Sequence, residues 1–200
     1  MRSVEFDGQA ITPCKILCLG RNYVEHAHEL GNEVPDEAVY FIKPNSAISE
    51  ELVWRQGLHY EAEISFLVQN GGLAGVAVGL DLTLRNVQAE LKAKGLPWER
   101  AKAFRASALF SYFVPIKSWQ GLEVRLYRNG ELVQRGDTSL MIFKPDHFVK
   151  ELEEIFGLDD GDIIMSGTPK GVGPVVRGDR FVGEIWQNKE RLLQKIWQAT

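Results

Sequence analysis

The sequence predicts an α+β fold that is rich in strands and contains only a few short helices. Short apolar runs bounded by Gly and Pro recur along the chain, which is typical of strands joined by tight turns. The alternation of strand and helix that marks a doubly wound sheet is missing. The 200 residues contain no linker, repeat or low-complexity tract, so a single domain over residues 1–200 is expected.

The first half of the chain is predicted to contain strands and two short helices. Gly31 and Gly95 end the helices, and the sequence Asn-Gly-Gly at 70–72 forms a tight turn between two strands. The predicted strands cover residues 15–20, 39–44, 61–68 and 75–84, and the predicted helices cover residues 22–32 and 86–95.

The second half begins with a hairpin over residues 121–136, whose Asn129-Gly130 turn pairs Arg128 with Glu131 and Leu126 with Val133. An amphipathic helix follows over residues 145–157. Its predicted N-cap is Asp146, and its predicted apolar face is formed by Phe148, Leu152, Ile155 and Phe156. A buried strand within residues 161–169 then runs into a Gly/Pro loop, and the chain ends in strands.

Charge and composition exclude several classes of protein. The net charge is −4 and no Lys/Arg cluster occurs, which argues against a nucleic-acid binder. No apolar run reaches the ~18 residues that span a bilayer, and the N-terminus lacks the apolar core of a signal peptide. Cys14 and Cys18 share a strand face with Ile16, which predicts buried free thiols in a reducing compartment. A soluble, cytoplasmic protein is therefore expected.

The stretch His-Tyr-Glu-Ala-Glu-Ile-Ser-Phe at 59–66 places two carboxylates on one face of a predicted strand. Glu61 and Glu63 would have Cα atoms roughly 6.5 Å apart, from the rise of an extended chain. Like charges that close repel each other unless water or a cation separates them. Alone, the pattern is most simply a half-buried strand with its polar face in solvent.

Asp81 is a third unusual carboxylate, on the small, polar side of the strand over residues 75–84. Gly79 would leave space beside it for a ligand or another backbone. Three carboxylates without Cys or His at ligand spacing form a hard oxygen set, which favours Mg²⁺, Mn²⁺ or Ca²⁺ over Zn²⁺. Spacing alone does not show that Asp81 meets Glu61 and Glu63.

Three further features could carry chemistry, each with a plainer interpretation. His26 and Glu29 share a helix face, as a base and its orienting carboxylate would, although a solvated polar helix gives the same pattern. Lys102 could stabilise an enolate, although a lone lysine is usually a surface charge. The Gly-rich loop over residues 166–174 could form an anion nest or a simple turn.

These features occur together in an order that resembles the fumarylacetoacetate hydrolase family, in particular its short members of the acylpyruvase and oxaloacetate decarboxylase type. The similar segments span roughly residues 16–180. They are LCLGRNYVEHAHELG, FIKP, HYEAEISFLV, GLDLTLRNVQ, GLPWERAKAF, NGELVQRGDTSLMIF and GDIIMSGTPKGVGP.

The resemblance implies a mixed β-roll, commonly dimeric, with one divalent cation, usually Mg²⁺ or Mn²⁺, held by Glu61, Glu63 and Asp81. It implies that His26 and Glu29 activate water on a segment that often closes as a lid, and that Lys102 is an active-site lysine. The residues that it places at the substrate are Arg21, Arg85, Gln88 and Thr168.

The implied activity is metal-dependent hydrolysis of an acylpyruvate or decarboxylation of oxaloacetate, both through a pyruvate enolate. The alternatives are an isomerase or hydratase for dienoic diacids, an oxaloacetate tautomerase, and a non-catalytic module that binds dicarboxylates. Asn86, Arg105 and Ala106 depart from residues common in the family, and their nearness to the site in sequence bears on substrate preference.

Overall fold

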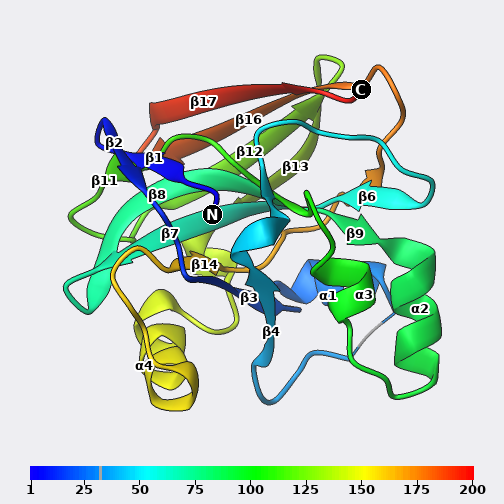
Figure 1. Cartoon of the computed structure of the whole chain (residues 1–200), viewed down its shortest axis with the longest axis horizontal. Coiled ribbons are helices and arrows are strands. Elements are labelled where there is room, and N and C mark those ends of the chain that lie inside the picture. Colours follow the sequence, from blue (N-terminus) through cyan, green and yellow to red (C-terminus); the bar gives the residue numbers. More distant parts are fainter. Residues whose placement is uncertain (32) are drawn as a thin grey trace.

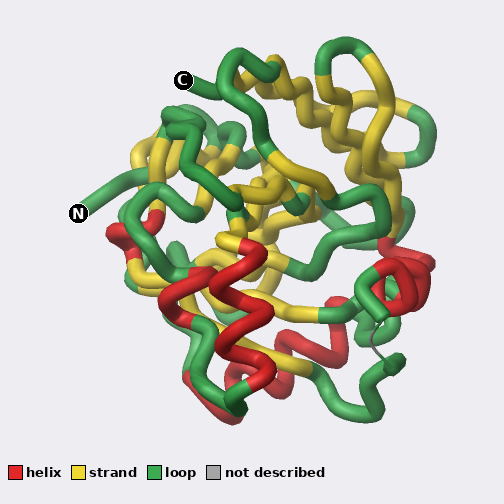
Figure 2. The backbone as a smooth tube through the Cα atoms, turned by 90° about the vertical axis from the view of Figure 1, so that its right-hand side faces the viewer, coloured by secondary structure: helices red, strands yellow, loops and turns green. Residues whose placement is uncertain are grey.

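The computed structural model describes residues 1–31 and 33–200. Asn32, the last residue of the predicted helical segment 22–32, lies outside the described residues. Strands dominate, and the helices lie in the lower half of the molecule, away from the four-stranded sheet at the top (Figures 1 and 2). The predicted strand-rich architecture with short helices is confirmed.

The strands form four sheets within the described residues. The largest sheet has the order β4 (Val39–Pro44), β3 (Lys15–Gly20), β14 (Ile163–Met165), β7 (Ala62–Gln69), β8 (Gly72–Asp81), β10 (Ala108–Phe110) and β5 (Ile48–Ser49), with β11 (Val114–Pro115) also on β8. It is mixed, because β14 runs parallel to β3 and β10 runs parallel to β5, whereas the other pairs are antiparallel.

The other three sheets are antiparallel. The second sheet has the order β13 (Glu131–Asp137), β12 (Leu122–Arg128), β16 (Arg180–Gln187) and β17 (Glu190–Gln198). The third has the order β15 (Gly173–Pro174), β6 (Leu58–Tyr60) and β9 (Thr83–Leu84), and the fourth pairs β1 (Val4–Phe6) with β2 (Gln9–Ile11).

The helices are short. They are α1 (Val24–Glu29), α2 (Arg85–Ala93), α3 (Glu99–Lys102) and α4 (Pro145–Phe156), with 3₁₀ turns at Asn45–Ala47 and Thr138–Leu140. The predicted cap of α4 is wrong: Lys144 is the N-cap and Pro145 fills the first helical position, where a missing N–H costs nothing. Phe148 and Leu152 are buried as predicted, but Ile155 lies mostly in solvent.

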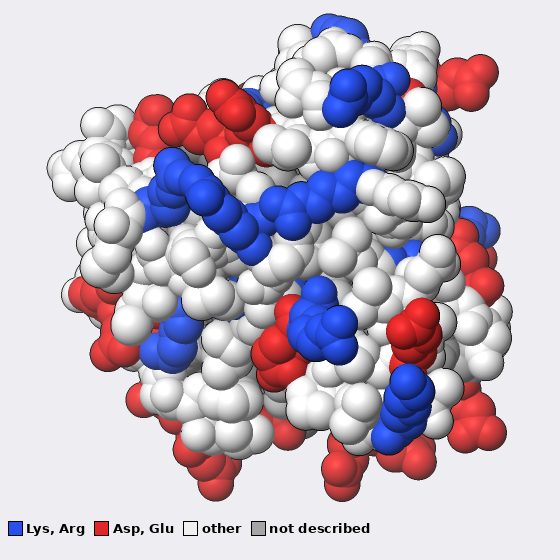
Figure 3. Space-filling view, turned by 45° about the vertical axis from the view of Figure 1, so that its right-hand side comes forward, with Lys and Arg blue, Asp and Glu red and all other residues white. Residues whose placement is uncertain are grey.

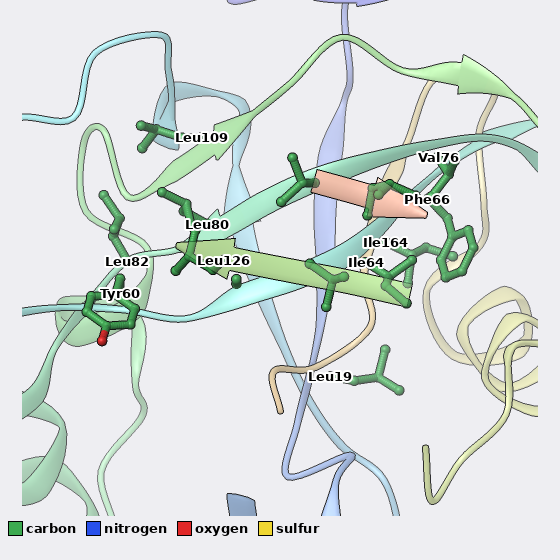
Figure 4. Packing of buried hydrophobic residues seen from close by; sticks show 14 of the residues in the cluster. Leu19, Tyr60, Ile64, Phe66, Val76, Leu80, Leu82, Leu109, Leu126 and Ile164 are labelled. Carbon is green, nitrogen blue, oxygen red and sulfur yellow. The ribbon is translucent and has the colours of Figure 1, made fainter. Parts of the chain in front are cut away.

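The main core lies between the two larger sheets. Apolar side chains of β7, β8, β12 and β14 meet there, among them Ile64, Leu80, Leu126 and Ile164 (Figure 4). Burying this many aliphatic side chains stabilises the fold by roughly 1.5–3 kcal/mol each before the cost of ordering the chain. The core fixes the strands whose opposite faces carry the polar site.

Two details differ from the sequence prediction. Arg128 pairs with Glu131 as expected, but Leu126 lies opposite Gln134 rather than Val133, because a bulge follows Leu126 and shifts the register by one residue. Both cysteines are free, but only Cys18 is buried. Cys14 is exposed because it precedes β3 rather than lying in it.

Charges of both signs are spread over the surface. Figure 3 shows Lys and Arg side chains crossing the middle of one face, with Asp and Glu side chains along its edges and beside the lower Lys and Arg side chains. In the part of the chain that the structure describes, no helix has the length and apolar character needed to cross a membrane.

Candidate active site

Glu61, Glu63 and Asp81 meet in the interior. Glu61 lies between β6 and β7, Glu63 lies in β7, and Asp81 ends β8, where its N–H donates to the Glu61 carbonyl at 2.8 Å. One carboxylate oxygen from each residue lies within 4.8 Å of the other two, and the three residues are at most 4% exposed. The interpretation of this strand face as solvated is therefore wrong.

Burial and charge act differently on the neighbouring carboxyl groups. Burial and the nearby Asp81 charge raise the pKa of Glu63 well above its ordinary value. Burial has the same tendency at Glu61, but the charges of Lys102 and Arg85 outweigh it and hold the pKa of Glu61 below its ordinary value. An ionised carboxylate here needs a positive partner, because the site excludes most water.

Positively charged side chains surround these carboxylates. Lys102 Nζ lies 2.7 Å from Glu61 Oε2 and 2.5 Å from Asp81 Oδ2, while Arg85 hydrogen-bonds Glu61. Burial opposes the charge on Lys102, yet Asp81 and Glu61 together raise its pKa above the ordinary value. Lys102 is therefore a buried, charged lysine rather than a surface charge.

The residues fit one divalent cation. The donors are carboxylate oxygens, which hard divalent ions prefer. Asp81 Oδ1 is buried and makes no directed hydrogen bond within the described residues, although the Lys43 ammonium lies 2.8 Å away. Burial, and then the charge of Asp81, raise the pKa of Glu63, and a bound cation would favour its ionised form. The three carboxylates are thus suited to bind a divalent cation.

Lys43 is a functional candidate that the sequence prediction missed. It lies in β4 with no exposed surface, and its ammonium donates to the carbonyls of Lys102 and Ser107 and to the Ser107 hydroxyl. It thereby joins Asp81 to the end of α3, which carries Lys102. Only its place in FIKP pointed to it, because a lysine at the end of a strand is normally solvated.

His26 and Glu29 form the pair that the helical spacing predicts. His26 is 5% exposed, and its Nδ1 lies 3.1 Å from Glu29 Oε2. The other oxygen of Glu29 accepts a hydrogen bond from the Gly171 N–H at 2.9 Å. The carboxylate therefore fixes the imidazole and also joins α1 to the Gly-rich loop, so the interpretation as a solvated helix face is wrong for His26.

The Gly-rich loop at 166–174 holds carboxylates of the protein itself. The N–H of Gly167 donates to Glu63 Oε2 at 2.8 Å, and the N–H of Gly171 donates to Glu29. Gly167 has φ = +97°, a backbone conformation that favours glycine. The loop thus binds two carboxylates of the protein, those of Glu63 and Glu29, through separate main-chain N–H groups.

Two buried amides that the sequence prediction missed anchor this loop. Asn22 donates to the Ser166 carbonyl at 2.8 Å. Gln134 accepts from the Ala62 N–H and donates to Thr168 Oγ1 at 2.8 Å. The Thr168 hydroxyl in turn donates to the Ala62 carbonyl, which leaves its main-chain N–H as the donor that it can offer to a ligand. Amide side chains give little signal in a sequence until their partners are known.

The pocket over the carboxylates brings together all the predicted substrate residues. Arg85 Nη1 donates to Gln88 Oε1 at 2.8 Å, which orients both side chains on α2. Gly79 does not open space for a ligand as expected, because the Ser65 hydroxyl and the side chains of Met165 and Phe110 fill that volume. The residues that line the pocket include Arg21, His26, Arg85, Gln88, Lys102 and Thr168, together with Phe41, Lys92 and Trp98.

The departures from the family pattern lie outside the pocket. Asn86 is exposed on α2, and Arg105 and Ala106 line a separate surface hollow near the N-terminus. They adjoin residues of the site in sequence but do not themselves line the pocket.

The comparisons with known proteins agree with this geometry. The model of the fumarylacetoacetate (FAA) hydrolase C-terminal family matches residues 15–195. Mitochondrial oxaloacetate tautomerase FAHD1 from Bos taurus is 42% identical over 190 residues, covering 85% of this chain and 86% of that protein. Oxaloacetate tautomerase YcgM from Escherichia coli is 38% identical over 191 residues, covering 84% and 86%.

A solved structure adds the chemistry of a relative. Fumarylpyruvate hydrolase from Pseudomonas aeruginosa, crystallised with Mn²⁺ and pyruvate, superposes with a TM-score of 0.89 at 30% identity, covering 100% of this chain and 95% of that chain. The relatives are enzymes that act on small 2-oxo acids, as the resemblance implied. The chain belongs to the fumarylacetoacetate hydrolase family of enzymes.

Proposed function

We propose that this protein is a divalent-metal-dependent enzyme that acts on small 2-oxo acids through a pyruvate enolate. The observation that carries the proposal is the buried meeting of three carboxylates with Lys102 in one pocket. Acylpyruvate hydrolysis and oxaloacetate decarboxylation both pass through such an enolate. Tautomerisation of oxaloacetate, the activity named for the relatives, needs only proton transfer at the same carbon.

Glu61, Glu63 and Asp81 would hold the cation, which we propose is Mg²⁺ or Mn²⁺, with Ca²⁺ also compatible with oxygen ligands. When bound, it supplies a Lewis acid that polarises the keto acid. Mn²⁺ is the ion crystallised with the relative from Pseudomonas aeruginosa. Lys43 and Arg85 would keep Asp81 and Glu61 in place through their ion pairs.

Lys102 would bind the developing enolate, because its raised pKa keeps it positively charged inside the pocket. Arg85, Gln88 and the main-chain N–H of Thr168 would bind substrate oxygens. His26, oriented by Glu29, would take a proton from water in hydrolysis or from the substrate carbon in tautomerisation. Decarboxylation needs no such base, since loss of carbon dioxide itself leaves the enolate.

A substrate panel tests the proposal. Acetylpyruvate, oxaloacetate and the enol of oxaloacetate are assayed with Mg²⁺ or Mn²⁺ and again after EDTA. We expect turnover that depends on the metal. Activity that survives complete metal removal would refute the mechanism, and tight binding of oxalate without turnover of any 2-oxo acid would favour a non-catalytic binding module.

The role of His26 has a separate test. His26→Ala is expected to slow acetylpyruvate hydrolysis by about 10²–10⁴-fold, the usual contribution of a positioned general base. Tautomerisation should suffer less, because solvent can exchange that proton. Equal losses in both reactions would argue against water activation.

We also propose that residues 1–200 form one domain, which works as a homodimer in the cytoplasm. The homodimer follows from the family resemblance, and the two free thiols suit a reducing compartment. Sedimentation equilibrium tests the dimer, and fractionation of cells that express the untagged protein tests the location.

A further inference from the structure

Ala62, which separates two of the three carboxylates in the chain, is hydrogen-bonded through both of its main-chain polar groups to buried side chains. Its N–H donates to Gln134 Oε1 at 2.9 Å, and its carbonyl accepts from the Thr168 hydroxyl at 2.8 Å. Gln134 Nε2 donates to Thr168 Oγ1 at 2.8 Å. Ala62, Gln134 and Thr168 therefore form a closed hydrogen-bonded ring, and all three residues are at most 3% exposed.

The ring takes the place of a neighbouring strand. β14 pairs with β7 over Ile163–Met165, and this pairing ends at Ser65. Beyond that residue, the N–H and C=O groups of Ala62 need other partners, because buried main-chain groups are costly to leave without hydrogen bonds. Gln134 suits this place because one end of its amide accepts from Ala62 while the other end donates to Thr168 and to the Pro169 carbonyl.

Glycines allow β13, the strand of Gln134, to approach the Gly-rich loop this closely. A Cβ at Gly136 would lie 2.7 Å from the Pro169 Cβ, and a Cβ at Gly171 would lie 1.9 Å from the Val133 carbonyl oxygen. A side chain at either position would therefore push the strand and the loop apart. The contact that closes the ring is thus supported at two separate places in the fold.

The ring is joined to the carboxylates from two directions. Glu61 and Glu63, which form a triad of carboxylates with Asp81, are the neighbours of Ala62 in the chain. The two peptide groups between them are the ones that carry the Ala62 N–H and the Ala62 carbonyl. Gly167 of the loop also donates to Glu63 Oε2 at 2.8 Å. Hydrogen bonds to these groups fix the spacing of two carboxylates that would otherwise repel each other.

On the basis of the proposed function, we propose that Gln134 and Thr168 are positioning residues that set the affinity of the triad for its divalent cation. Their hydrogen bonds hold both peptide groups between Glu61 and Glu63, so that the carboxylates converge before the cation binds. The Thr168 hydroxyl acts through Ala62 and does not need to touch the cation. Partners that orient metal ligands in this way contribute about 10- to 100-fold to metal affinity.

Near-isosteric variants test the ring through Mn²⁺ affinity, measured by calorimetry at a fixed pH. Thr168→Val removes the hydroxyl but keeps the main-chain N–H, and Gln134→Met removes the amide. Each should weaken Mn²⁺ binding by about tenfold or more. Thr168→Ser keeps the hydroxyl and should bind Mn²⁺ as the wild type does. The double variant of Gln134→Met and Thr168→Val should lose little more than either single variant, because each change already opens the same ring.

Ser111→Ala separates this effect from a general loss of stability. The Ser111 hydroxyl is also buried, and it accepts a hydrogen bond from the Val78 N–H of β8, the strand that carries Asp81. This variant should lower the melting temperature and leave Mn²⁺ affinity unchanged. Equal weakening of Mn²⁺ binding in Ser111→Ala, or wild-type affinity in Thr168→Val and Gln134→Met, overturns the proposal and leaves the metal-dependent chemistry intact.

Amide hydrogen exchange in the metal-free wild type tests the ring without any substitution, and it decides the matter where a variant fails to fold. The Ala62 N–H should exchange as slowly as the N–H groups paired between β7 and β8. Fast exchange that slows only when Mn²⁺ is added would overturn the proposal, since the cation would then order the strand itself.

The outcomes also separate the ring from the proposed function. Mn²⁺ binding that depends on the ring, without turnover of any 2-oxo acid, would overturn the proposed function and leave the role of Gln134 and Thr168 intact. A wild type that binds no Mn²⁺ would overturn both.

Discussion

Lys43 is the residue on which the polar interior depends most. Its ammonium has no route to solvent, and it satisfies two main-chain carbonyls as well as the Asp81 carboxylate. Lys43→Met would leave those oxygens buried without a donor. We expect the free energy of unfolding to fall by about 3–5 kcal/mol, as it does when one partner of a buried ion pair is removed. Urea denaturation of the metal-free protein measures the loss.

Lys94→Met is the matched control for this prediction, because Lys94 is exposed at the end of α2. It should change stability by no more than about 0.5 kcal/mol. If Lys43→Met lowered the free energy of unfolding by less than about 1 kcal/mol, Lys43 would not be essential to the buried polar network.

Glu63 should make metal binding dependent on pH. Burial and the charge of Asp81 raise the pKa of Glu63, so the metal-free protein keeps this proton where an ordinary glutamate has lost it. Only the carboxylate binds a cation, so low pH competes with the metal. In the pH range below the raised pKa, we expect Mn²⁺ affinity to rise about tenfold per pH unit, with one proton released per ion.

Calorimetry in two buffers of different ionisation enthalpy measures that proton release. Glu63→Gln should abolish it. An affinity that stays constant from pH 5 to pH 8 would show that Glu63 is already ionised in the metal-free protein. By the same linkage, the metal-free fold should lose stability as the pH rises above the ordinary pKa of a glutamate, because the folded state then binds more protons than the unfolded state.

At the residue scale, site residues could be predicted where they break a local pattern, such as an acid on a strand face. Residues whose role depends on partners far along the chain could not be predicted. Two acids on one strand face are visible in a sequence. Lys43 and Gln134 look ordinary in the sequence. Lys43 binds Asp81, 38 residues away, and Gln134 binds Thr168, more than 30 residues away, so each meets its partner only after folding.

At the scale of elements, the hairpin of β7 and β8 brings the acids together. The Asn70-Gly71 turn alone would place Glu61 opposite Leu80, so Glu61 and Asp81 would lie on opposite faces of the sheet. A bulge at Leu67/Val68 shifts the register by one, so that Ala62 faces Leu80 and Glu61 comes level with Asp81. The alternation of apolar residues in β7 and β8 requires the shifted register. Without the shift, the apolar side chains of the two strands would point to opposite faces of the sheet. Turn and alternation together thus predict the bulge, although either alone does not.

The same strand pair explains why Gly79 has no side chain. A Cβ at Gly79 would collide with the Ser65 hydroxyl and press on Met165 and Phe110. We expect Gly79→Ala to lower the free energy of unfolding by about 1–3 kcal/mol, the usual cost of overpacking. Adding Ser65→Gly should recover part of that loss, and chemical denaturation of the four members of this double-mutant cycle measures the coupling.

Gly72→Ala is the control for this cycle, because a Cβ at Gly72 would meet nothing within 4 Å. It should have little effect on stability, and Ser65→Gly should not alter that effect. Additive losses for Gly79→Ala and Ser65→Gly would contradict the steric explanation, since the two residues would then act independently.

At the scale of the whole molecule, the main core should make unfolding cooperative. The main cluster draws side chains from both large sheets and from α4, so neither sheet keeps its apolar face covered without the other. The strand-rich class could be predicted from local patterns. The mixed order of the large sheet could not, because β14 enters between β3 and β7 from more than 90 residues away in sequence.

Metal binding by Glu61, Glu63 and Asp81 should raise the stability of the folded domain. Three carboxylates held in place by the fold bind the cation far better than the unfolded chain does, so Mn²⁺ at one hundred times its Kd should stabilise the protein by about 2.7 kcal/mol. For a chain of this size that is a rise in melting temperature of roughly 5–10 °C. Circular dichroism and tryptophan fluorescence should report one coincident transition, as expected for a single domain. Glu63→Gln is the matched control and should lose most of the shift. A shift that persists in Glu63→Gln would mean that Mn²⁺ stabilises the fold from somewhere other than the triad.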